Sequence, residues 1–144
     1  GKNKKFKNFF LHHEQSCSMA ADVYGRVKKK PAVVCVTTGP GGINTINGVF
    51  GAYTDSVPMI IISGQVKTAT NMIIQKKKGL RQLGDQENDI IYMVKKITKK
   101  TFLVRNQSDL IKNFNNLITL SWSGRPGPIW IDVPVNIQGE KLSK

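Results

Sequence analysis

The first half of the chain alternates between helical and strand-like hydrophobic patterns. From Glu14 onward, apolar residues recur at intervals of three and four, as on one stripe of an amphipathic helix. The stripe consists of Cys17, Ala20, Ala21, Tyr24 and Val27. The lysines at 28–30 suit the negative end of the helix dipole, and Pro31 stops the helix. Residues 32–36 are short, continuous and β-branched, which predicts a strand buried on both faces.

The same alternation continues with a turn, a helix and a second strand. Residues 37–42 are rich in threonine, glycine and proline and cannot continue a strand, so they predict a turn. A helix is predicted from about Ile43 to Tyr53. Residues 59–62 predict another buried strand, and the polar, Lys-rich residues 66–84 predict a surface loop with room for a helical turn.

The second half repeats these elements. Helical spacing returns at residues 90–94 and again at 109–122, whereas residues 101–104 and 129–133 predict strands, the last one stopped by Pro134. Buried strands that alternate with helices form right-handed βαβ units. We therefore predict an α/β fold, a parallel β-sheet with helices on both faces, in which ligands bind beyond the carboxyl ends of the strands.

Length and composition favour one domain with a packed core. The chain has 144 residues, of which 40% are hydrophobic and 22% charged, which lies outside the disordered class. Cys17 and Cys35 lie among apolar neighbours, so we expect reduced core residues of an intracellular protein. No apolar run approaches the roughly 18 residues of a membrane helix, and the basic N-terminus lacks a secretory signal. We expect a cytoplasmic protein with no membrane partner.

The formal charge of +13 comes from lysine clusters at the ends of the predicted segments. A nucleic-acid surface would place such clusters on one face, interleaved with exposed aromatic side chains. Here the aromatic residues make up 8% of the chain and fall mostly inside apolar patterns. Abundant Lys, Asn and Ile also arise from an AT-rich coding bias. We therefore expect no nucleic-acid partner.

Two groups of candidate residues follow apolar runs and so belong at strand ends. Glu14 follows the run at residues 9–11, and residues 39–44 follow the strand at 32–36. Taken alone, Glu14 is a first-turn acid of the kind that stabilises a helix by about 0.3–1 kcal/mol. The glycine turn matches no nucleotide-binding pattern, and His12 and His13 lack the HExxH spacing of a zinc site.

The combination of motifs is far more specific than its parts. In order, the chain contains His13-Glu14-Gln15, Ala20-Ala21-Asp22-x-Tyr24-Gly25-Arg26, Thr38-Gly39-Pro40-Gly41, Asn44, Gly51-Ala52-Tyr53-Thr54-Asp55-Ser56-Val57-Pro58, Ser63-Gly64-Gln65, Gln86-Glu87, Thr98-Lys99, Gly124-Arg125-Pro126-Gly127-Pro128 and Ile131-Asp132-Val133-Pro134. Over about residues 9–140, this order and spacing resembles the N-terminal, pyrimidine-binding domain of thiamine diphosphate enzymes, most closely the acetolactate synthase large subunit and its relatives.

The resemblance implies that the aminopyrimidine ring of thiamine diphosphate binds at the strand ends. Glu14 matches the family's catalytic glutamate, which hydrogen-bonds the N1′ atom of that ring and promotes loss of the thiazolium C2 proton. Pro40 and Asn44 match positions that line the pyrimidine pocket. Gly39 and Gly41 belong to the same turn, where backbone must approach the ring closely.

The resemblance also implies a catalytic role for Gln86, because it matches a glutamine near the substrate, a 2-oxo acid such as pyruvate. Three features depart from the acetolactate synthase pattern: Asp85 stands in place of Phe, Lys67 in place of Pro, and residues 66–86 form a longer loop. These departures concern the acceptor substrate. They are shared by relatives whose acceptor is a keto-sugar of surface-polysaccharide synthesis.

By the standard of that family, the domain is incomplete at its N-terminus, and the middle and diphosphate-binding domains are absent. The cofactor would lie between this domain and the diphosphate-binding domain of another subunit, in a homodimer or higher oligomer. Magnesium would be held by that domain, and a flavin (FAD) by the middle domain. We expect residues 1–8 to be a disordered basic end, 9–140 the domain and 141–144 a tail, and the chain alone to be inactive.

Two classes of function remain open. The first is a portion of a thiamine diphosphate-dependent carboligase, or of a related lyase or decarboxylase of surface-sugar biosynthesis. The second is a non-catalytic remnant or assembly module that kept the fold and lost the chemistry. Retention of Glu14 favours the first class, because packing does not demand an acid there.

Overall fold

The structure, a computed structural model, describes residue 5 and residues 7–141. In chain order its elements are α1 (Glu14–Lys28), β1 (Ala32–Val36), α2 (Pro40–Thr54), β2 (Met59–Gln65), the 3₁₀ turn η1 (Thr68–Thr70), α3 (Met72–Gln75), α4 (Ile90–Val94), β3 (Lys100–Leu103), α5 (Gln107–Trp122), β4 (Pro128–Pro134) and α6 (Val135–Gln138). Most of the predicted basic end and tail, residues 1–4, 6 and 142–144, lies outside the described residues.

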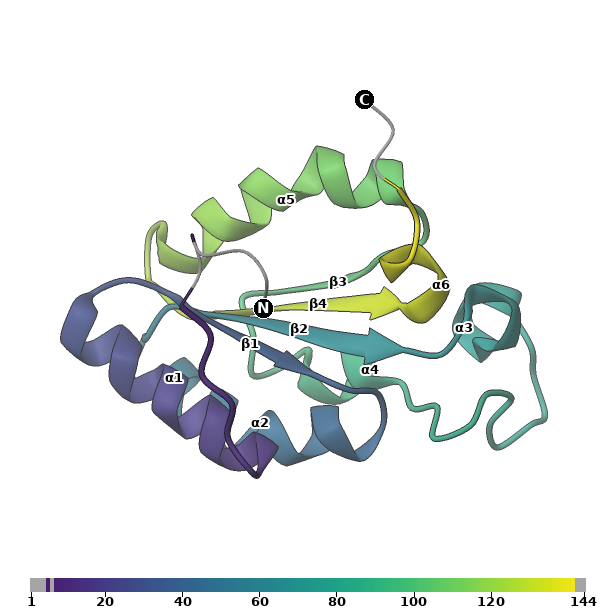
Figure 1. Cartoon of the computed structure of the whole chain (residues 1–144), viewed down its shortest axis with the longest axis horizontal. Helices are drawn as coiled ribbons and strands as arrows, with labels where there is room; N and C mark the ends of the chain where they lie inside the picture. Colours follow the sequence, from purple (N-terminus) through teal and green to yellow (C-terminus); the bar gives the residue numbers. More distant parts are fainter. Residues whose placement is uncertain (1–4, 6, 142–144) are drawn as a thin grey trace.

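Within the described part of the chain, four strands form one parallel sheet in the order β1-β2-β4-β3. Helices α1, α2 and α4 pack on one face and α5 on the other (Figure 1). This arrangement confirms the predicted α/β fold, a parallel sheet with helices on both faces. The carboxyl ends of the strands share one edge, and the connections that lead to α2, α3 and α6 begin there (Figure 1).

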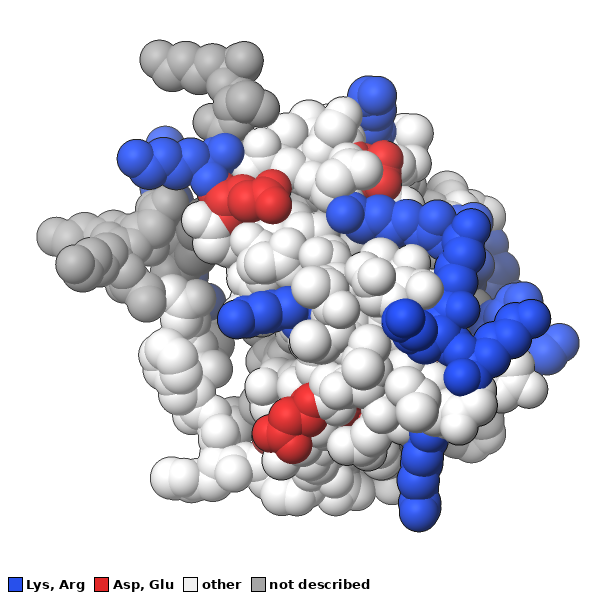
Figure 2. All heavy atoms as spheres, turned by 90° about the vertical axis from the view of Figure 1, so that its right-hand side faces the viewer, with Lys and Arg blue, Asp and Glu red and all other residues white. Residues whose placement is uncertain are grey.

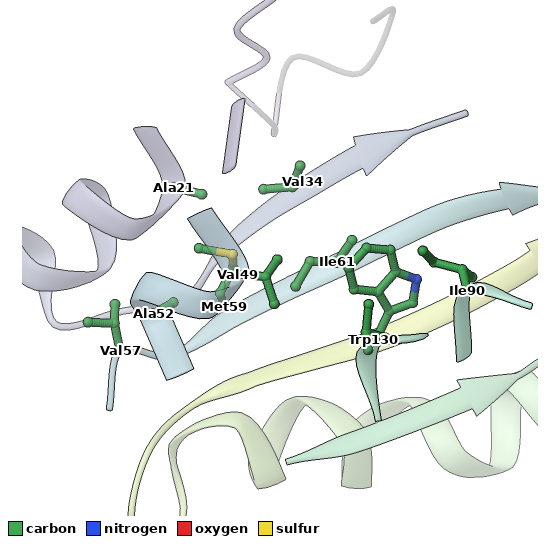
Figure 3. Packing of buried hydrophobic residues seen from close by; sticks show 10 residues of the cluster. Ala21, Val34, Val49, Ala52, Val57, Met59, Ile61, Ile90 and Trp130 are labelled. Carbon is green, nitrogen blue, oxygen red and sulfur yellow. The ribbon is translucent and has the colours of Figure 1, made fainter. Parts of the chain in front are cut away.

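The central strands β2 and β4 carry the core. Every residue of β4 is buried, as are most residues of β2, so these two strands are buried on both faces as predicted. Side chains alternate between the two faces of the sheet. Met59, Ile61 and Trp130 pack toward α1, α2 and α4 (Figure 3). Ile60 and Ile129 belong to the second cluster, on the side of α5 and α6.

Strand β1 is less buried than the sequence predicts. Val34 is 4% exposed, but Val33 is 56% exposed and Cys35 is also exposed. The prediction of a strand buried on both faces is therefore wrong for β1, and so is the expectation that Cys35 is a core residue; Cys17 is half-buried. The reason is that β1 lies at the sheet edge, where described helices pack on one face only.

Small residues form the buried face of α1, and only part of the predicted apolar stripe lies on that face: Ala21 is buried and Cys17 packs against the core. Ser18, Ala21 and Gly25 are buried, whereas Val27 of the predicted stripe is 70% exposed. The reason is close packing against the turn before β2, because a Cβ on Gly25 would lie 2.5 Å from Cγ1 of Val57. The hydrophobic pattern therefore located the helix and two residues of its core-facing side, Cys17 and Ala21, but it wrongly included the exposed Tyr24 and Val27.

Other elements differ from the prediction mainly at their ends. Helix α2 begins at Pro40 rather than near Ile43, because proline is favoured in the first helical turn. Strand β2 continues to Gln65, and β4 ends at Pro134 as predicted, with α6 following it directly. The helical turns η1 and α3 occupy the predicted surface loop, and α4 lies at the predicted residues 90–94.

The first apolar run does not form a strand. Residues 9–11 have no regular secondary structure, and Phe9 and Phe10 are 82% and 87% exposed. The expectation that Glu14 follows a strand end is therefore wrong. Glu14 is positioned instead by α1, of which it is the first residue.

Candidate functional site

Glu14 and Asn44 meet where the first turns of α1 and α2 lie together. His13 is the N-cap of α1, and its side chain accepts a hydrogen bond from the backbone N–H of Gln15 at 3.2 Å. Asn44 lies near the start of α2, and its Nδ2 donates to Oε2 of Glu14 at 3.1 Å. Both side chains are half-buried. The fold thus joins two predicted site residues that are 30 positions apart.

The pKa of Glu14 is lowered from its ordinary value. The main cause is the hydrogen bond from Asn44, followed by one from the backbone N–H of Glu14 itself, while burial acts in the opposite direction. At neutral pH the side chain is therefore an ionised carboxylate at a helix N-terminus, where the helix dipole favours negative charge. Because Glu14 is only half-buried, a donor from outside the chain can reach it.

The turn from β1 into α2 brings bare backbone close to Glu14. Gly39 has a φ of 61°, and a Cβ there would lie 2.6 Å from the backbone oxygen of Gln86, so the position requires glycine. Gly41 is buried, and a Cβ there would lie 3.7 Å from Oε1 of Glu14. Pro40, between them, is exposed at the start of α2. The glycines keep the turn free of side chains toward Glu14 and toward Gln86.

Gln86 belongs to a loop that lies against this turn. The loop is linked to Gly39 by a hydrogen bond from Nδ2 of Asn88 to the Gly39 carbonyl oxygen, at 3.4 Å. Gln86 has a φ of 54° and an exposed side chain. Among the described residues, no hydrogen bond joins that side chain to Glu14 or Asn44. The structure therefore brings the Gln86 backbone to the turn but does not bring its amide to the carboxylate.

The side chain of Glu87 hydrogen-bonds both ends of the Lys-rich segment 72–84, here called the basic loop. Its Oε1 accepts from the backbone N–H of Met72 at 2.5 Å. Its Oε2 accepts from the backbone N–H groups of Leu83 and Gly84 at 2.9 and 3.0 Å. The lysines at 76–78 lie between these two ends. Figure 2 views the strand-end side of the molecule, where Lys and Arg side chains gather over part of the surface.

Behind the turn lies a buried polar network formed by Asp132, Ser63 and Gln65. These residues belong to the motifs of the family resemblance, but the sequence pattern assigned them no role of their own. Asp132 of β4 is 1% exposed; it accepts from Oγ of Ser63 at 2.5 Å and from Nε2 of Gln65 at 2.8 Å. The pKa of Asp132 is raised to about 6, mainly by burial and to a smaller extent by the charge of Asp89, while the two hydrogen bonds act in the opposite direction. The available sequence signal was a polar residue near the end of each of two apolar strands, because Ser63 and Asp132 are partners in the sheet.

A cavity of about 920 Å³ lies on the α5 side of the sheet, next to the strand ends. Its mostly apolar lining includes Cys35, Ile62, Leu110, Val133 and Ile137. It also touches Thr37 and Thr38, which precede the glycine turn, but it includes none of the predicted site residues. This cavity is therefore separate from the Glu14 site.

The site has the chemistry of an organic-ligand site. Within residue 5 and residues 7–141, no group of three or more His, Cys, Asp or Glu side chains is arranged to hold a metal ion. No helix in the same described part combines the length and apolar composition needed to cross a bilayer. One carboxylate, one amide and a glycine turn suit a ligand that offers hydrogen-bonding groups on a flat ring.

The chain is similar to known proteins along most of its length. Residues 1–89 match the family described as thiamine pyrophosphate enzyme, N-terminal TPP binding domain. The chain is 42% identical over 131 residues to the acetolactate synthase large subunit of Buchnera aphidicola subsp. Acyrthosiphon pisum, which covers 91% of this chain and 21% of that protein. It is 33% identical over 139 residues to the mitochondrial acetolactate synthase of Schizosaccharomyces pombe, covering 96% and 19%. It is 34% identical over 140 residues to the chloroplastic acetolactate synthase of Arabidopsis thaliana, covering 95% and 19%.

Two statements follow from these similarities. The chain spans about a fifth of the length of the curated relatives that it matches. The family match extends over more than half of the chain and includes every predicted site residue. Together with the parallel sheet, it confirms the resemblance inferred from the motifs: the chain belongs to the thiamine pyrophosphate enzyme family, whose N-terminal TPP-binding domain it contains.

Proposed function

We propose that this chain is the pyrimidine-binding portion of a thiamine diphosphate-dependent, acetolactate synthase-like carboligase in which Glu14 activates the cofactor. The observation that carries the proposal is the pair formed by Glu14 and Asn44. It presents a carboxylate with a lowered pKa, oriented by an amide and partly open to solvent, beside a turn in which Gly41 leaves space toward that carboxylate. The names of the relatives, acetolactate synthases, supply the reaction class.

The residues at the turn fit a flat heterocycle that carries a ring nitrogen. Asn44 occupies Oε2 of Glu14, which leaves Oε1, on the side of Gly41, for the ligand. When bound, thiamine diphosphate supplies an electron sink for bond cleavage next to a carbonyl carbon. Glu14 holds or releases a proton at its carboxylate, whereas an amide in its place would hold the ring without exchanging a proton.

We assign 2-oxo acids, pyruvate first, as the substrate class, with Gln86 as the residue of this chain nearest the substrate. The loop that carries Gln86 lies against the Gly39 turn, which supports this assignment. The acceptor is either a second 2-oxo acid or, in a related lyase or decarboxylase of surface-sugar biosynthesis, a keto-sugar. The exposed Asp85 next to Gln86 favours a polar acceptor.

The chain spans about a fifth of its relatives' length, and within its described residues no group of acidic, histidine or cysteine side chains is arranged to hold a metal ion. We propose that the diphosphate-binding domain of another subunit anchors the diphosphate and magnesium, in a cytoplasmic homodimer or higher oligomer. A flavin (FAD) would belong to a middle domain. The chain alone is then inactive, and a non-catalytic assembly module is the alternative that the experiment below separates.

Reconstitution tests the proposal. The 144-residue chain and its Glu14→Gln variant are each combined with a diphosphate-binding domain, pyruvate, magnesium and thiamine diphosphate, and carbon dioxide release is measured. We expect release from the parent mixture, at least about 100-fold less from the variant, and none without the added domain. Glu140→Gln, the same exchange at an exposed acid, should match the parent. Comparable release from parent and Glu14→Gln would remove Glu14 from the mechanism, and product analysis with and without a keto-sugar identifies the acceptor.

A further inference from the structure

Asp132 is a charged residue in a completely buried strand, and the proposed chemistry does not use it. All residues of β4 are buried, and Asp132 is 1% exposed. Moving a carboxylate out of water costs free energy, and its raised pKa shows that the two hydrogen bonds offset only part of this cost. An apolar side chain at this position would avoid the cost. The role of Asp132 must therefore lie in the groups that it binds.

One of those groups, the side-chain amide of Gln65, is fully used. Gln65 is 3% exposed, and its Nε2 donates to Asp132 at 2.8 Å and to the backbone oxygen of Asn88 at 3.1 Å. Its Oε1 accepts from Oγ1 of Thr38 at 3.3 Å and from the backbone N–H of Val66 at 2.9 Å. Two donors and two acceptor positions thus each have a partner.

Asp132 contributes the charged partner that orients this amide. An ionised carboxylate only accepts hydrogen bonds, so the NH₂ group of Gln65 must face it. The Asn88 carbonyl oxygen, which only accepts, and the Val66 N–H, which only donates, favour the same orientation. Asp132 is itself held from the other side by Ser63, whose Oγ donates to the carboxylate and accepts from Nε1 of Trp130 at 2.8 Å. The carboxylate is therefore fixed within the sheet and can orient Gln65.

The remaining partners of Gln65 belong to two segments of the candidate site. Thr38 directly precedes Gly39, and Asn88 follows Gln86 by two positions. Asn88 also links the two segments directly, because its Nδ2 donates to the carbonyl oxygen of Gly39. Gln65 therefore connects the sheet, the glycine turn and the Gln86 loop through one amide.

We propose that Asp132 is a positioning residue: by orienting Gln65, it holds the Gln86 loop against the Gly39 turn and so sets the place of Gln86 beside the Glu14 site. Asp132 acts through Gln65 from inside the sheet and does not touch the ligand. The importance of Gln86 rests on the proposed function, whereas the connection itself rests on the contacts described above.

The test compares Asp132→Leu with Ser63→Ala in the 144-residue chain. Asp132→Leu removes the acceptor that orients Gln65, whereas Ser63→Ala removes the other hydrogen bond of Asp132 and leaves the Gln65 contact. In Asp132→Leu we expect the backbone amide NMR signals of Val66 and residues 86–88 to move and the Val66 N–H to exchange about tenfold faster, the factor for one lost hydrogen bond. Ser63→Ala should lower the unfolding temperature but move these signals clearly less than Asp132→Leu does, because it leaves the hydrogen bond between Gln65 and Asp132 in place.

Two results would overturn the proposal: signals of Val66 and residues 86–88 that stay unmoved in Asp132→Leu, or signals that move as far in Ser63→Ala. A second measurement covers the case in which Asp132→Leu does not fold. In the parent chain, both side-chain amide protons of Gln65 should exchange at least about 100-fold more slowly than those of an exposed glutamine; rapid exchange would also overturn the proposal.

Neither measurement uses the cofactor or catalytic activity. A failed reconstitution with an active diphosphate-binding domain would count against the proposed function and leave the connection through Gln65 intact. Unmoved loop signals in Asp132→Leu would remove the connection even if Glu14 proves catalytic. The two failures are therefore distinguishable.

Discussion

Two carboxylates lie toward the same end of the sheet in opposite environments. Glu14 is half-buried at a helix N-terminus, and its pKa is lowered, chiefly by the hydrogen bond from Asn44. Asp132 is sealed inside β4, and burial raises its pKa to about 6 although it accepts two hydrogen bonds. Exposure, rather than the number of donors, therefore decides the direction of each shift.

The difference separates two uses of the same chemical group. The carboxylate of Glu14 keeps one oxygen for a group from outside the chain, whereas both oxygens of Asp132 are occupied by β2 side chains. An acid that is ionised and reachable can exchange a proton with a ligand. An acid that is enclosed and fully bonded instead fixes the side chains around it.

The largest expected effect is on activity and concerns Glu14. In the reconstituted enzyme, Glu14→Gln should lower carbon dioxide release by about 10²–10⁴-fold, because proton exchange at the carboxylate is lost. The free energy of unfolding should fall by no more than about 1 kcal/mol, the contribution of a charged side chain in the first turn of a helix. Urea denaturation of both chains checks the second value. If activity and stability fell together, Glu14 would be a structural acid like Asp132.

The second effect is a rise in stability on mild acidification. Folded Asp132 binds a proton near pH 6, whereas the ordinary pKa is 3.8, so the folded state binds more protons between these values. Asp132 should therefore raise the free energy of unfolding by about 2 kcal/mol as the pH falls from above 6 to about 4. Glu14 acts in the opposite direction, since its lowered pKa gives stability that is lost at lower pH. Urea denaturation across this range should show the rise, and Asp132→Leu should abolish it.

The third effect tests the turn between the two acids. Gly39→Ala should lower the free energy of unfolding by about 1–3 kcal/mol, because an L-residue is strained at positive φ, and the new Cβ would also meet the Gln86 carbonyl oxygen. Gly124→Ala is the matched control, since Gly124 has a φ of 58° with nothing within 4 Å of a Cβ. Equal losses in both variants would show that the Gln86 contact carries no energy.

The smallest effect concerns Asn44. Asn44→Ala removes the largest cause of the lowered pKa of Glu14, so that pKa should rise while the pKa of Asp132 stays in place. NMR titration of the side-chain carboxyl carbons measures both groups in one sample. An unchanged titration of Glu14 would contradict the role given to Asn44.

The sequence predicted most of the helices and strands that the structure describes. The hydrophobic pattern located each strand of the described part of the chain. The motif order predicted that Glu14 and Asn44 share one site, and a hydrogen bond joins the two side chains. Gln86 was included through family resemblance alone, because nothing in its local pattern marks a loop residue that packs against Gly39. The catalytic roles of these residues stay predictions.

Other features depend on tertiary position, which a local pattern does not contain. The apolar residues of β1 resemble those of β2, yet β1 lies at the edge of the sheet and Val33 is exposed. Gly25 is buried because a neighbouring turn leaves no room for a Cβ, a fact that apolar periodicity ignores. The sequence pattern assigns no role to Asp132, because a polar residue within an apolar strand does not reveal which side chains it binds.

The bonds made by Glu87 have a consequence for the history of the basic loop. The carboxylate of Glu87 binds Met72 at one end of the basic loop and Leu83 and Gly84 at the other, so both ends of this loop are held at one point. Lengthening a loop with fixed ends costs little, because the entropic free energy of loop closure rises by only about 0.6 kcal/mol for each doubling of loop length. Insertions and deletions between these anchor points can therefore accumulate during evolution without shifting the residues that follow Glu87 toward the sheet.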